Sequence, residues 1–513
     1  MPPLIPLETA ARRFRSRIVQ ALFLLCLGVS GCTGGSSDTS SPSGTSSPSG
    51  AVCPGGQGSS SPLLCVLSPT AGMTLQPGPV TLSFVVNNFS IGLAGQPHLR
   101  FFLDNDPIPF DFYSGPDEDT GVLYQGAHNH ESHWKSSTSF QIYQQPAGDH
   151  KLLLELVDAT GNPLGNSGSS QTVSFTIATP PNGEFILEPV LSNLNIPVRM
   201  VLAPDGRVFY SELLTGDVRI VDIVGGTWQV RSTPFYHVEV GHGKDQGLLG
   251  LTLDPNFLTN HHVYMYHVTA DESHNRLIRV TEVNGQGTDE LPILDGLPAN
   301  EIHNGGMLRF GPDGKLYVTI GEFNQPDLAQ DLTSLGGKIL RLNSDGSIPP
   351  GNPFGNSPIY AMGLRNSFGL VFHPLTGDLW ATENGPDRDD EVDRIVAGAN
   401  YGWPIVTGIS GDPRFRDPIV TYTPPIGATG VTTIPSNALY PPEYHHNLLF
   451  AEVNGGTLHR IALAGAALDH LASSTVAFNG GLGGLLDVFQ GPGGYLYASS
   501  FDAIYRIVPN PKS

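Results

Sequence analysis

Pro312-Asp-Gly-Lys-Leu-Tyr-Val318 is a tight turn followed by an aromatic-rich strand, and the same pattern recurs along the chain. Its six copies begin at Pro204, Pro255, Pro312, Pro374, Pro442 and Pro492. A repeat of about 50 to 70 residues in a β-rich sequence is typical of propeller blades, each a small sheet that buries its faces only against its neighbours. The repeat therefore predicts an all-β fold, a six-bladed β-propeller over residues 185–510.

The composition agrees with this prediction and excludes other classes of protein. The chain has 513 residues with 62 Gly and 44 Pro, which favours short strands and turns over long helices. It has 47 Asp and Glu against 26 Lys and Arg, a formal net charge of −21. Nucleic-acid binding needs a dense basic surface, so no nucleic-acid partner is expected.

Residues 1–31 have the pattern of a bacterial export signal. Four arginines precede the apolar run Ile18–Val29, which is too short to span a bilayer. The run ends in Val29-Ser30-Gly31-Cys32, which resembles the lipobox of bacterial lipoproteins; the alternative is an ordinary secretory signal followed by a chance cysteine. We expect a lipid anchor at Cys32, and Thr33 in place of an aspartate favours the outer membrane, facing the periplasm or the exterior.

Two segments separate the signal from the propeller. Residues 32–62 are mostly Ser, Gly, Thr and Pro, which predicts a flexible tether. From residue 63 to 180, alternating apolar runs such as Lys151–Val157 lie between turns and predict an immunoglobulin-like β-sandwich.

Cysteines and histidines in these segments give two further expectations. Cys53 and Cys65 are able to pair in an oxidising compartment, and two free thiols are the alternative. The segment His128-Asn-His130-Glu-Ser-His133 contains three imidazoles, but no further ligands lie at metal-site spacing. A polar loop is therefore favoured over a metal site there.

Three polar clusters of the propeller have side chains suited to chemistry. They are Glu301-Ile-His303-Asn-Gly-Gly306, Gly363-Leu-Arg365-Asn366 and the stretch from Glu383 to Glu391. The imidazole of His303 is suited to accept a hydroxyl proton, and Arg365 to stabilise negative charge on an oxygen. The third cluster offers the carboxylate and carbonyl oxygens that Ca²⁺ prefers. The pattern alone nevertheless favours ordinary polar turns for all three.

A family resemblance gives these clusters a more specific meaning. Five stretches carry it, Gly247–Pro255, His303–Val318, Leu335–Asn343, Gly363–Asn366 and Asn400–Pro404. In this order they resemble the glucose/sorbosone dehydrogenase family, soluble quinoproteins that use pyrroloquinoline quinone (PQQ) and Ca²⁺ on a six-bladed propeller. The resemblance covers about residues 195–510 and implies a sugar or small alcohol as substrate, with a respiratory electron acceptor.

The resemblance implies catalytic roles for three residues. His303 matches the base that takes the proton of the sugar hydroxyl while hydride passes to the quinone. Glu322 matches the carboxylate that orients this base and is one methylene longer than the usual aspartate. Arg365 matches a residue beside the reactive quinone oxygen.

The resemblance also implies binding roles. Asn366 accompanies Arg365 beside the cofactor, and Asp245 and Gln246 share the place of a glutamine that contacts it. Four further residues match calcium ligands, namely Gly385, Pro386, Glu391 and Tyr401. The carbonyls of the first two match a site that holds Ca²⁺ against the cofactor as a Lewis acid, and the last two match a second, structural site.

Three positions depart from the family pattern. PQQ carries three carboxylates, which the sugar dehydrogenases neutralise with a lysine and two arginines. Asn454, Gly484 and Leu486 stand at those positions, while Lys338 and Arg341 are candidates to replace them from another blade. Each lost charge-assisted hydrogen bond removes roughly 1.5–3 kcal/mol, so the departures predict weakened cofactor binding.

Two functions stay open on this evidence. The first is PQQ- and calcium-dependent oxidation of an aldose sugar or a related alcohol or aldehyde. The second is a catalytically degenerate, calcium-stabilised propeller that binds a glycan or a protein. A hydrolase in which Ca²⁺ activates water near His303 is a third possibility that rests on analogy of fold alone.

Overall fold

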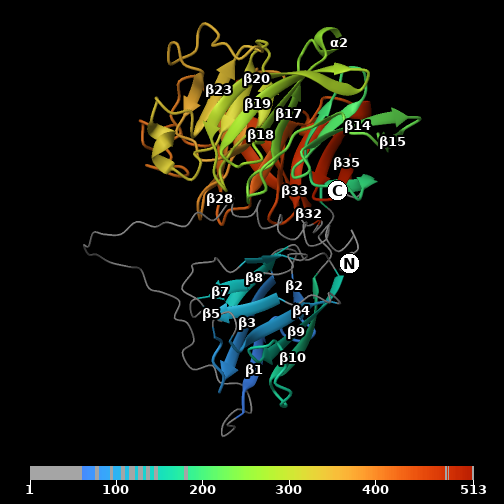
Figure 1. Cartoon of the computed structure of the whole chain (residues 1–513), viewed down its shortest axis with the longest axis vertical. Helices are drawn as coiled ribbons and strands as arrows, with labels where there is room; N and C mark the ends of the chain where they lie inside the picture. Colours follow the sequence, from blue (N-terminus) through green and yellow to red (C-terminus); the bar gives the residue numbers. More distant parts are fainter. Residues whose placement is uncertain are drawn as a thin grey trace, which may run out of the picture. The chain divides into compact units, whose positions relative to one another are not determined.

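The computed structural model describes residues 183–510, apart from 480, 481 and 483, and residues 61–177, apart from 76–79, 93–95, 105–109, 115–121, 125–130, 135–138 and 144–147. The chain divides into two compact units between Pro180 and Pro181 (Figure 1). The predicted signal and lipid anchor and all but the last two residues of the predicted tether lie outside the described residues. No helix in the described part is long and apolar enough to cross a membrane.

The first unit consists of two β-sheets. One sheet has the order β1 (Leu63–Ser68), β3 (Val80–Asn87), β8 (Ser139–Tyr143), β6 (Val122–Tyr124). The other has the order β2 (Thr74–Leu75), β10 (Ser170–Ile177), β9 (Gly148–Val157), β4 (His98–Leu103), β5 (Phe110–Ser114), β7 (Glu131–Trp134). Alternate residues such as Phe84 of the first sheet and Leu154 of the second share one core, as in a sandwich. The immunoglobulin-like topology stays a prediction.

The predicted cysteine pair and the histidine segment 128–133 lie only partly within the described residues. Cys65 lies on β1 and is disulfide-bonded, while its expected partner Cys53 lies outside the described residues. His128 and His130 also lie outside them, and only the backbone of His133, on β7, is described.

The second unit confirms the predicted six-bladed propeller, with six antiparallel sheets in a row along the chain (Figure 1). Blade 1 is β12 (Pro197–Leu202), β13 (Val208–Glu212), β14 (Asp217–Val224) and β15 (Thr227–Val230), with β16 (Tyr236–His237) paired to β14. Blade 2 is β17 (Leu248–Leu253), β18 (His262–Val268), β19 (His274–Val283) and β20 (Gln286–Pro298), with helix α2 (Phe257–Asn260). Blade 3 is β21 (Leu308–Phe310), β22 (Leu316–Ile320), β23 (Lys338–Leu342) and β24 (Ile359–Met362), with the 3-10 helix η1 (Pro326–Gln330).

The remaining three blades follow the same plan. Blade 4 is β25 (Ser367–Phe372), β26 (Leu379–Glu383), β27 (Asp390–Ile395) and β28 (Val420–Tyr422). Blade 5 is β29 (Ala428–Thr433), β30 (Leu448–Glu452), β31 (Thr457–Ala464) and β32 (His470–Asn479), with η2 (Pro442–Tyr444). Blade 6 is β33 (Leu485–Gln490), β34 (Leu496–Ser500), β35 (Ala503–Pro509) and β11 (Phe185–Ser192), with η3 (Pro492–Gly494). Because β11 pairs with β35, the first strand of the unit completes its last blade.

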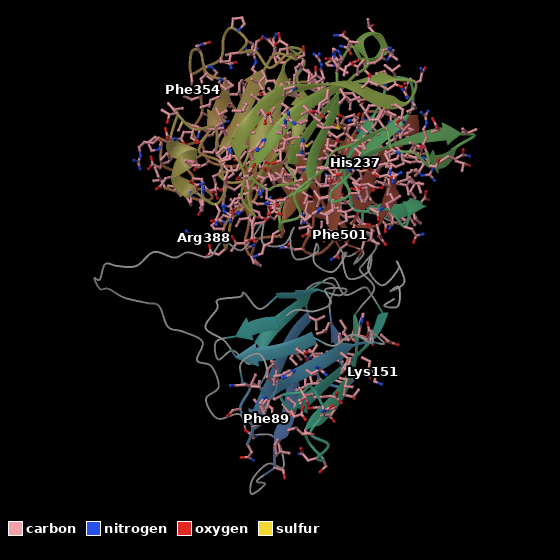
Figure 2. The ribbon with its side chains drawn as sticks, in the orientation of Figure 1. Phe89, Lys151, His237, Phe354, Arg388 and Phe501 are labelled. Atoms are coloured by element: carbon pink, nitrogen blue, oxygen red, sulfur yellow. The ribbon has the colours of Figure 1, made fainter. Side chains whose placement is uncertain are left out.

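Each copy of the sequence repeat leads into the second strand of a blade, from β13 in blade 1 to β34 in blade 6. Gly206 and Gly314 in two of these turns have φ of +91° and +69°, which glycine adopts without steric cost. The apolar residues of the strands form clusters that each join two neighbouring blades, and side chains fill the space between the ribbons (Figure 2). The blades therefore bury their faces against one another, as the repeat predicts.

The first strands of the blades contact one another in a ring, β12 with β17 and β33, β21 with β17 and β25, and β29 with β25 and β33. In each antiparallel blade the start of the first strand lies beside the end of the second strand. Most of the predicted site residues lie before first strands or after second strands, and Glu391, at the start of β27, lies beside the end of β26. The fold therefore collects these residues at one end of the propeller.

Candidate active site

His303 and Glu322 form a buried pair in blade 3. His303 precedes β21 and Glu322 follows β22, and these strands are hydrogen-bonded neighbours. His303 Nδ1 lies 2.5 Å from Glu322 Oε1, and both side chains are 1% exposed. The other carboxylate oxygen of Glu322 accepts the N–H of Gln325 at 2.5 Å. His303 Nε2 is buried and has no hydrogen-bond partner among the described residues.

This environment keeps the His303 imidazole neutral. Burial lowers the pKa of His303 to about 4, and the nearby Arg365 guanidinium acts in the same direction. A carboxylate accepts hydrogen bonds, so Nδ1 carries the proton and donates it to Glu322. Nε2 then presents a lone pair with nothing bound to it, which is the state a general base requires.

Asp245 holds the backbone of the loop that carries His303. His303 has φ of +62°, and its N–H donates to Asp245 Oδ2 at 2.8 Å. The N–H of Asn304 and the side-chain amide of Asn366 donate to the same oxygen, each at 3.3 Å. Burial raises the pKa of Asp245 to about 7. The structure thus places Asp245, predicted as a cofactor contact, in a bridge between the base and Asn366.

The side chain of Gln246, the neighbouring predicted cofactor contact, is engaged in two hydrogen bonds. Its side-chain oxygen accepts the N–H of Gly243 at 2.7 Å, and its amide nitrogen donates to the carbonyl of Asn300 at 3.1 Å. Its side chain is buried.

Glu383 accepts hydrogen bonds from the backbone of Arg365 and Asn366. The sequence analysis did not predict Glu383 as a site residue. The Glu383 carboxylate accepts the N–H of Arg365 at 2.6 Å and that of Asn366 at 2.5 Å, and it also accepts the hydroxyl of Ser367. Burial raises the pKa of Glu383 to about 7. The sequence signal that could have identified Glu383 is its position as the last residue of the second strand of a blade. Glu212 and Glu452 occupy the same position in their blades.

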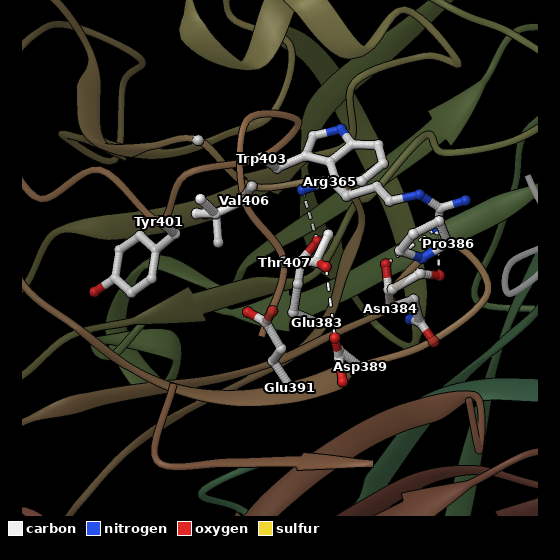
Figure 3. A pocket seen from close by; sticks show the side chains of 13 residues that line it. Arg365, Glu383, Asn384, Pro386, Asp389, Glu391, Tyr401, Trp403, Val406 and Thr407 are labelled. Atoms are coloured by element: carbon white, nitrogen blue, oxygen red, sulfur yellow. Dashed lines mark hydrogen bonds between the residues drawn. The ribbon is translucent and has the colours of Figure 1, made fainter. Parts of the chain in front are cut away.

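The four predicted calcium ligands line one small cavity beside Arg365 (Figure 3). Arg365 and Trp403 lie on one side of it and the carboxylates of Asp389 and Glu391 on the other, with Glu383 between them (Figure 3). Its lining is Gly363, Leu364, Arg365, Glu383, Asn384, Gly385, Pro386, Asp389, Glu391, Tyr401, Trp403, Val406 and Thr407.

The chemistry of this lining fits Ca²⁺. One oxygen of Glu391 accepts the N–H of Gly408 at 2.6 Å, and burial together with neighbouring carboxylates raises the pKa of Glu391. A divalent cation relieves such crowding of negative groups, and carboxylate and carbonyl oxygens are its preferred ligands. Arg365 donates to the carbonyls of Asn384 and Gly385, each at 3.0 Å, so a cation at the Gly385 carbonyl would have to share that oxygen with the guanidinium. Within the described part of the chain, no three His, Cys, Asp or Glu side chains are grouped to hold a metal, so such a site needs main-chain ligands.

The positions expected to meet the PQQ carboxylates do not fit them. Asn454 donates to the carbonyl of Pro425 at 2.9 Å, and its own side-chain oxygen is buried without a partner in the described structure. Leu486 is fully buried and Gly484 has no side chain. The residues present thus fit the reacting end of PQQ, through His303 and Arg365, and not its acidic end.

Neither candidate replacement is free to meet a cofactor carboxylate. Lys338 Nζ donates to the carbonyls of Leu328, Ala329 and Gly336 at 2.7 to 3.0 Å, which uses all three of its protons. Arg341 is bound to Asp313 at 2.9 Å and to Asn352 at 2.9 Å.

Fold and site together define a class of protein. It is a propeller that carries a buried imidazole–carboxylate pair and, beside an arginine, a cavity lined with oxygen atoms. Residues 194–504 match the model of the Glucose / Sorbosone dehydrogenase family, and the chain belongs to this family.

Several relatives of this chain have the names of sugar dehydrogenases. Quinoprotein glucose dehydrogenase B of Acinetobacter calcoaceticus is 37% identical over 44% of this chain and 53% of its own length. The aldose sugar dehydrogenase YliI of Escherichia coli is 31% identical over 43% of this chain and 62% of its own. The PQQ-bound aldose sugar dehydrogenase of Streptomyces coelicolor is a solved structure with 31% identity and a TM-score of 0.57, over 65% of this chain and 100% of that one.

One more distant relative has a different kind of name. The human hedgehog-interacting protein is 28% identical over 42% of this chain and 37% of its own length. The chain thus spans about half or less of the length of several relatives that it matches.

Proposed function

We propose that this protein oxidises the hydroxyl-bearing carbon of an aldose sugar or a related alcohol, with His303 as the general base. The observation that carries the proposal is the buried, neutral imidazole whose Nε2 has no partner among the described residues while Nδ1 is bound to Glu322. The sugar dehydrogenases among the relatives support the same class of reaction.

The chain's own residues move and stabilise the proton. His303 Nε2 accepts the hydroxyl proton, and the imidazolium that forms is stabilised by the Glu322 carboxylate 2.5 Å from Nδ1. The guanidinium of Arg365 opposes protonation of His303 and favours negative charge on the reacting oxygen. Glu383 fixes the backbone of Arg365 and Asn366 so that both stay beside the base.

The oxidation removes two electrons as hydride from the substrate carbon and leaves a carbonyl. PQQ would supply the hydride acceptor; Arg365 and Asn366 are the residues that would hold its reacting end, and the carbonyls of Gly385 and Pro386 would hold Ca²⁺. The electrons then pass to a respiratory acceptor. Export and a lipid anchor at Cys32 in the outer membrane would place this reaction in the cell envelope.

Reconstitution tests the proposed function. The protein is incubated with PQQ and Ca²⁺, and aldoses are screened for reduction of an artificial electron-acceptor dye. We expect sugar-dependent reduction that disappears when Ca²⁺ is chelated. Absence of reduction with every sugar, from protein that calorimetry shows to have bound PQQ, would contradict the proposal.

A second function has its own support. Asn454, Gly484 and Leu486 provide no cation for the PQQ carboxylates, and Lys338 is fully engaged, which fits a propeller that has kept the fold and lost the quinone. The name of the human relative fits a propeller that interacts with another protein. Absence of PQQ binding in the same calorimetric titration would favour this calcium-stabilised binding protein, with a glycan or a protein as partner.

A further inference from the structure

Five of the six blades share an irregularity near the start of their first strand. In β12, β17, β25 and β33 the pairing with the second strand passes over one residue, and in β29 it passes over two. The residues passed over in β12, β25 and β33 are Val198, Phe368 and Leu486. A bulge residue of this kind leaves the hydrogen-bond ladder, so its backbone groups need partners elsewhere.

Arg199 of β12 binds the carbonyls of these three residues. Its Nη2 donates to the carbonyl of Phe368 at 2.8 Å, and its Nη1 donates to that of Val198 at 3.1 Å and, more weakly, to that of Leu486 at 3.5 Å. Its guanidinium also lies over the ring of Phe368, 4.4 Å from the centroid. The Arg199 side chain is 1% exposed. One buried side chain therefore joins the bulges of blades 1, 4 and 6.

The contact with blade 4 crosses the centre of the propeller. In the ring of first strands, β12 contacts β17 and β33, whereas β25 contacts β21 and β29. Blades 1 and 4 are therefore not neighbours, and Arg199 reaches Phe368 across the middle of the ring. Asp487 of blade 6 provides the counter-charge, with Oδ1 3.9 Å from Arg199 Nη1 and Oδ2 accepting the N–H of Met200 at 3.0 Å. The guanidinium is thus paired and hydrogen-bonded, as a buried charge requires.

Phe368 lies close to the proposed site residues of blade 4. Arg365 and Asn366 directly precede β25, and Glu383 of β26 accepts their backbone N–H groups. Phe368 follows two residues later, at the position that the pairing with β26 passes over. Arg199 thus supports the start of β25 at the point where the blade's own ladder does not.

A shift of this segment would also reach the proposed base. The side-chain amide of Asn366 donates to Asp245 Oδ2 at 3.3 Å, and its oxygen accepts the N–H of Gly305 at 3.1 Å. The same oxygen of Asp245 accepts the N–H of His303 at 2.8 Å. The start of β25 and the loop of His303 are therefore linked through Asn366.

We propose that Arg199 is a positioning residue of the active site, which holds Arg365 and Asn366 in place through the carbonyl and the ring of Phe368. It acts through the main chain of β25 and not by contact with the substrate. Its effect on catalysis rests on the proposed function, whereas its effect on the order of residues 365–369 does not.

The test compares wild-type protein with Arg199→Lys. Lysine keeps the positive charge beside Asp487 but replaces the planar fork with a single nitrogen on a flexible stem, which weakens the contact across the ring. Hydrogen–deuterium exchange, read by mass spectrometry, measures the backbone protection of residues 365–369. We expect exchange in this segment to become roughly tenfold faster, while β27 keeps its wild-type protection.

The kinetic constants of the same variant separate positioning from general stability. In protein loaded with PQQ and Ca²⁺, kcat for sugar-dependent dye reduction is expected to fall roughly 10- to 100-fold, with KM changed by less than about twofold. The reason is that a displaced Arg365 loses its interaction with the reacting oxygen, which matters most in the transition state. A smaller fraction of folded protein would instead leave the exchange pattern even along the chain.

Arg460→Lys is the matched control. Arg460 of β31 is 9% exposed, donates to Glu184 through two nitrogens, each at 2.6 Å, and lies 4.4 Å from the centroid of the Tyr444 ring. This variant is expected to lower the Tm and to keep the wild-type exchange of residues 365–369 and the wild-type kcat. If Arg199→Lys does not fold, Arg199→Met combined with Asp487→Asn, which removes the buried ion pair as a whole, is measured in the same way.

Two outcomes would overturn the proposal. One is a folded Arg199 variant in which residues 365–369 exchange as in the wild type. The other is an active wild-type protein whose Arg199 variant loses no more kcat than Arg460→Lys. Wild-type protein that binds PQQ and oxidises no sugar would contradict the proposed function, and the exchange measurement would then decide the role of Arg199 alone.

Discussion

The proposed role of His303 as proton acceptor depends on the different surroundings of its two ring nitrogens. Glu322 fixes the proton on Nδ1 at 2.5 Å, and burial keeps Nε2 unprotonated. The sequence identified this residue and its partner through the family resemblance. It did not show that the Asp245 carboxylate accepts the main-chain N–H of His303, because that hydrogen bond joins residues 58 positions apart.

At the same scale, Asp245→Ala is expected to lower kcat roughly 10- to 100-fold with a small change in KM. The N–H groups of His303 and Asn304 lose their shared acceptor, and an unsatisfied buried donor costs about 1–3 kcal/mol, which here displaces the base. Steady-state dye reduction measures both constants. Asp254→Asn changes another buried carboxylate, which accepts the N–H of Asn256 at 2.9 Å in blade 2, and is the control for general destabilisation. Unchanged turnover in Asp245→Ala would show that the base is positioned without it.

In blades 1, 4 and 5 the second strand ends in a glutamate that caps a loop at the site end of the propeller. Glu383 caps residues 365–367, and Glu452 accepts the N–H groups of Gly455 and Thr457, each at 3.0 Å. Glu212 closes its own turn by accepting the hydroxyl of Thr215 at 2.7 Å. The sequence repeat predicted the strands because turn residues and apolar alternation are local signals. The cap by Glu383 escaped prediction because it joins residues 16 to 18 positions apart through the pairing of β25 with β26.

Burial of the Glu452 carboxylate predicts a pH-dependent stability. Burial raises the pKa of Glu452 from 4.5 to about 7, so the folded protein holds a proton that the unfolded chain releases. The stabilisation is present below about pH 4.5 and is lost as the pH rises to 7, because the folded state then gives up the proton. Glu452→Gln removes this dependence and is expected to gain up to about 3 kcal/mol relative to the wild type between pH 4.5 and 8.

Thermal unfolding at pH 5 and pH 8 checks the effect of Glu452→Gln. Glu443→Gln, an exposed carboxylate of the same blade, is the control and is expected to follow the wild type at both pH values. A difference in Tm between Glu452→Gln and the wild type that is the same at both pH values would contradict the assignment.

The whole propeller is closed by β11, which lies in the last blade although it comes first in the chain. The repeat could predict six blades but not this pairing, since the strand carries no copy of the turn motif. Closure fixes the ring of first strands, and the ring brings His303 of blade 3 and Arg365 of blade 4 to one site. The proposed catalysis therefore depends on the assembled ring, whereas the absence of cations for the PQQ carboxylates depends on residues of its last two blades.

The most direct test of the account is the turnover of His303→Ala in protein loaded with PQQ and Ca²⁺. We predict that the variant binds Ca²⁺ and PQQ like the wild type, because His303 lies outside the calcium cavity, and that its sugar-dependent dye reduction falls by roughly 10²- to 10⁴-fold. A folded variant that oxidises sugar at the wild-type rate would contradict the role of His303 as the base.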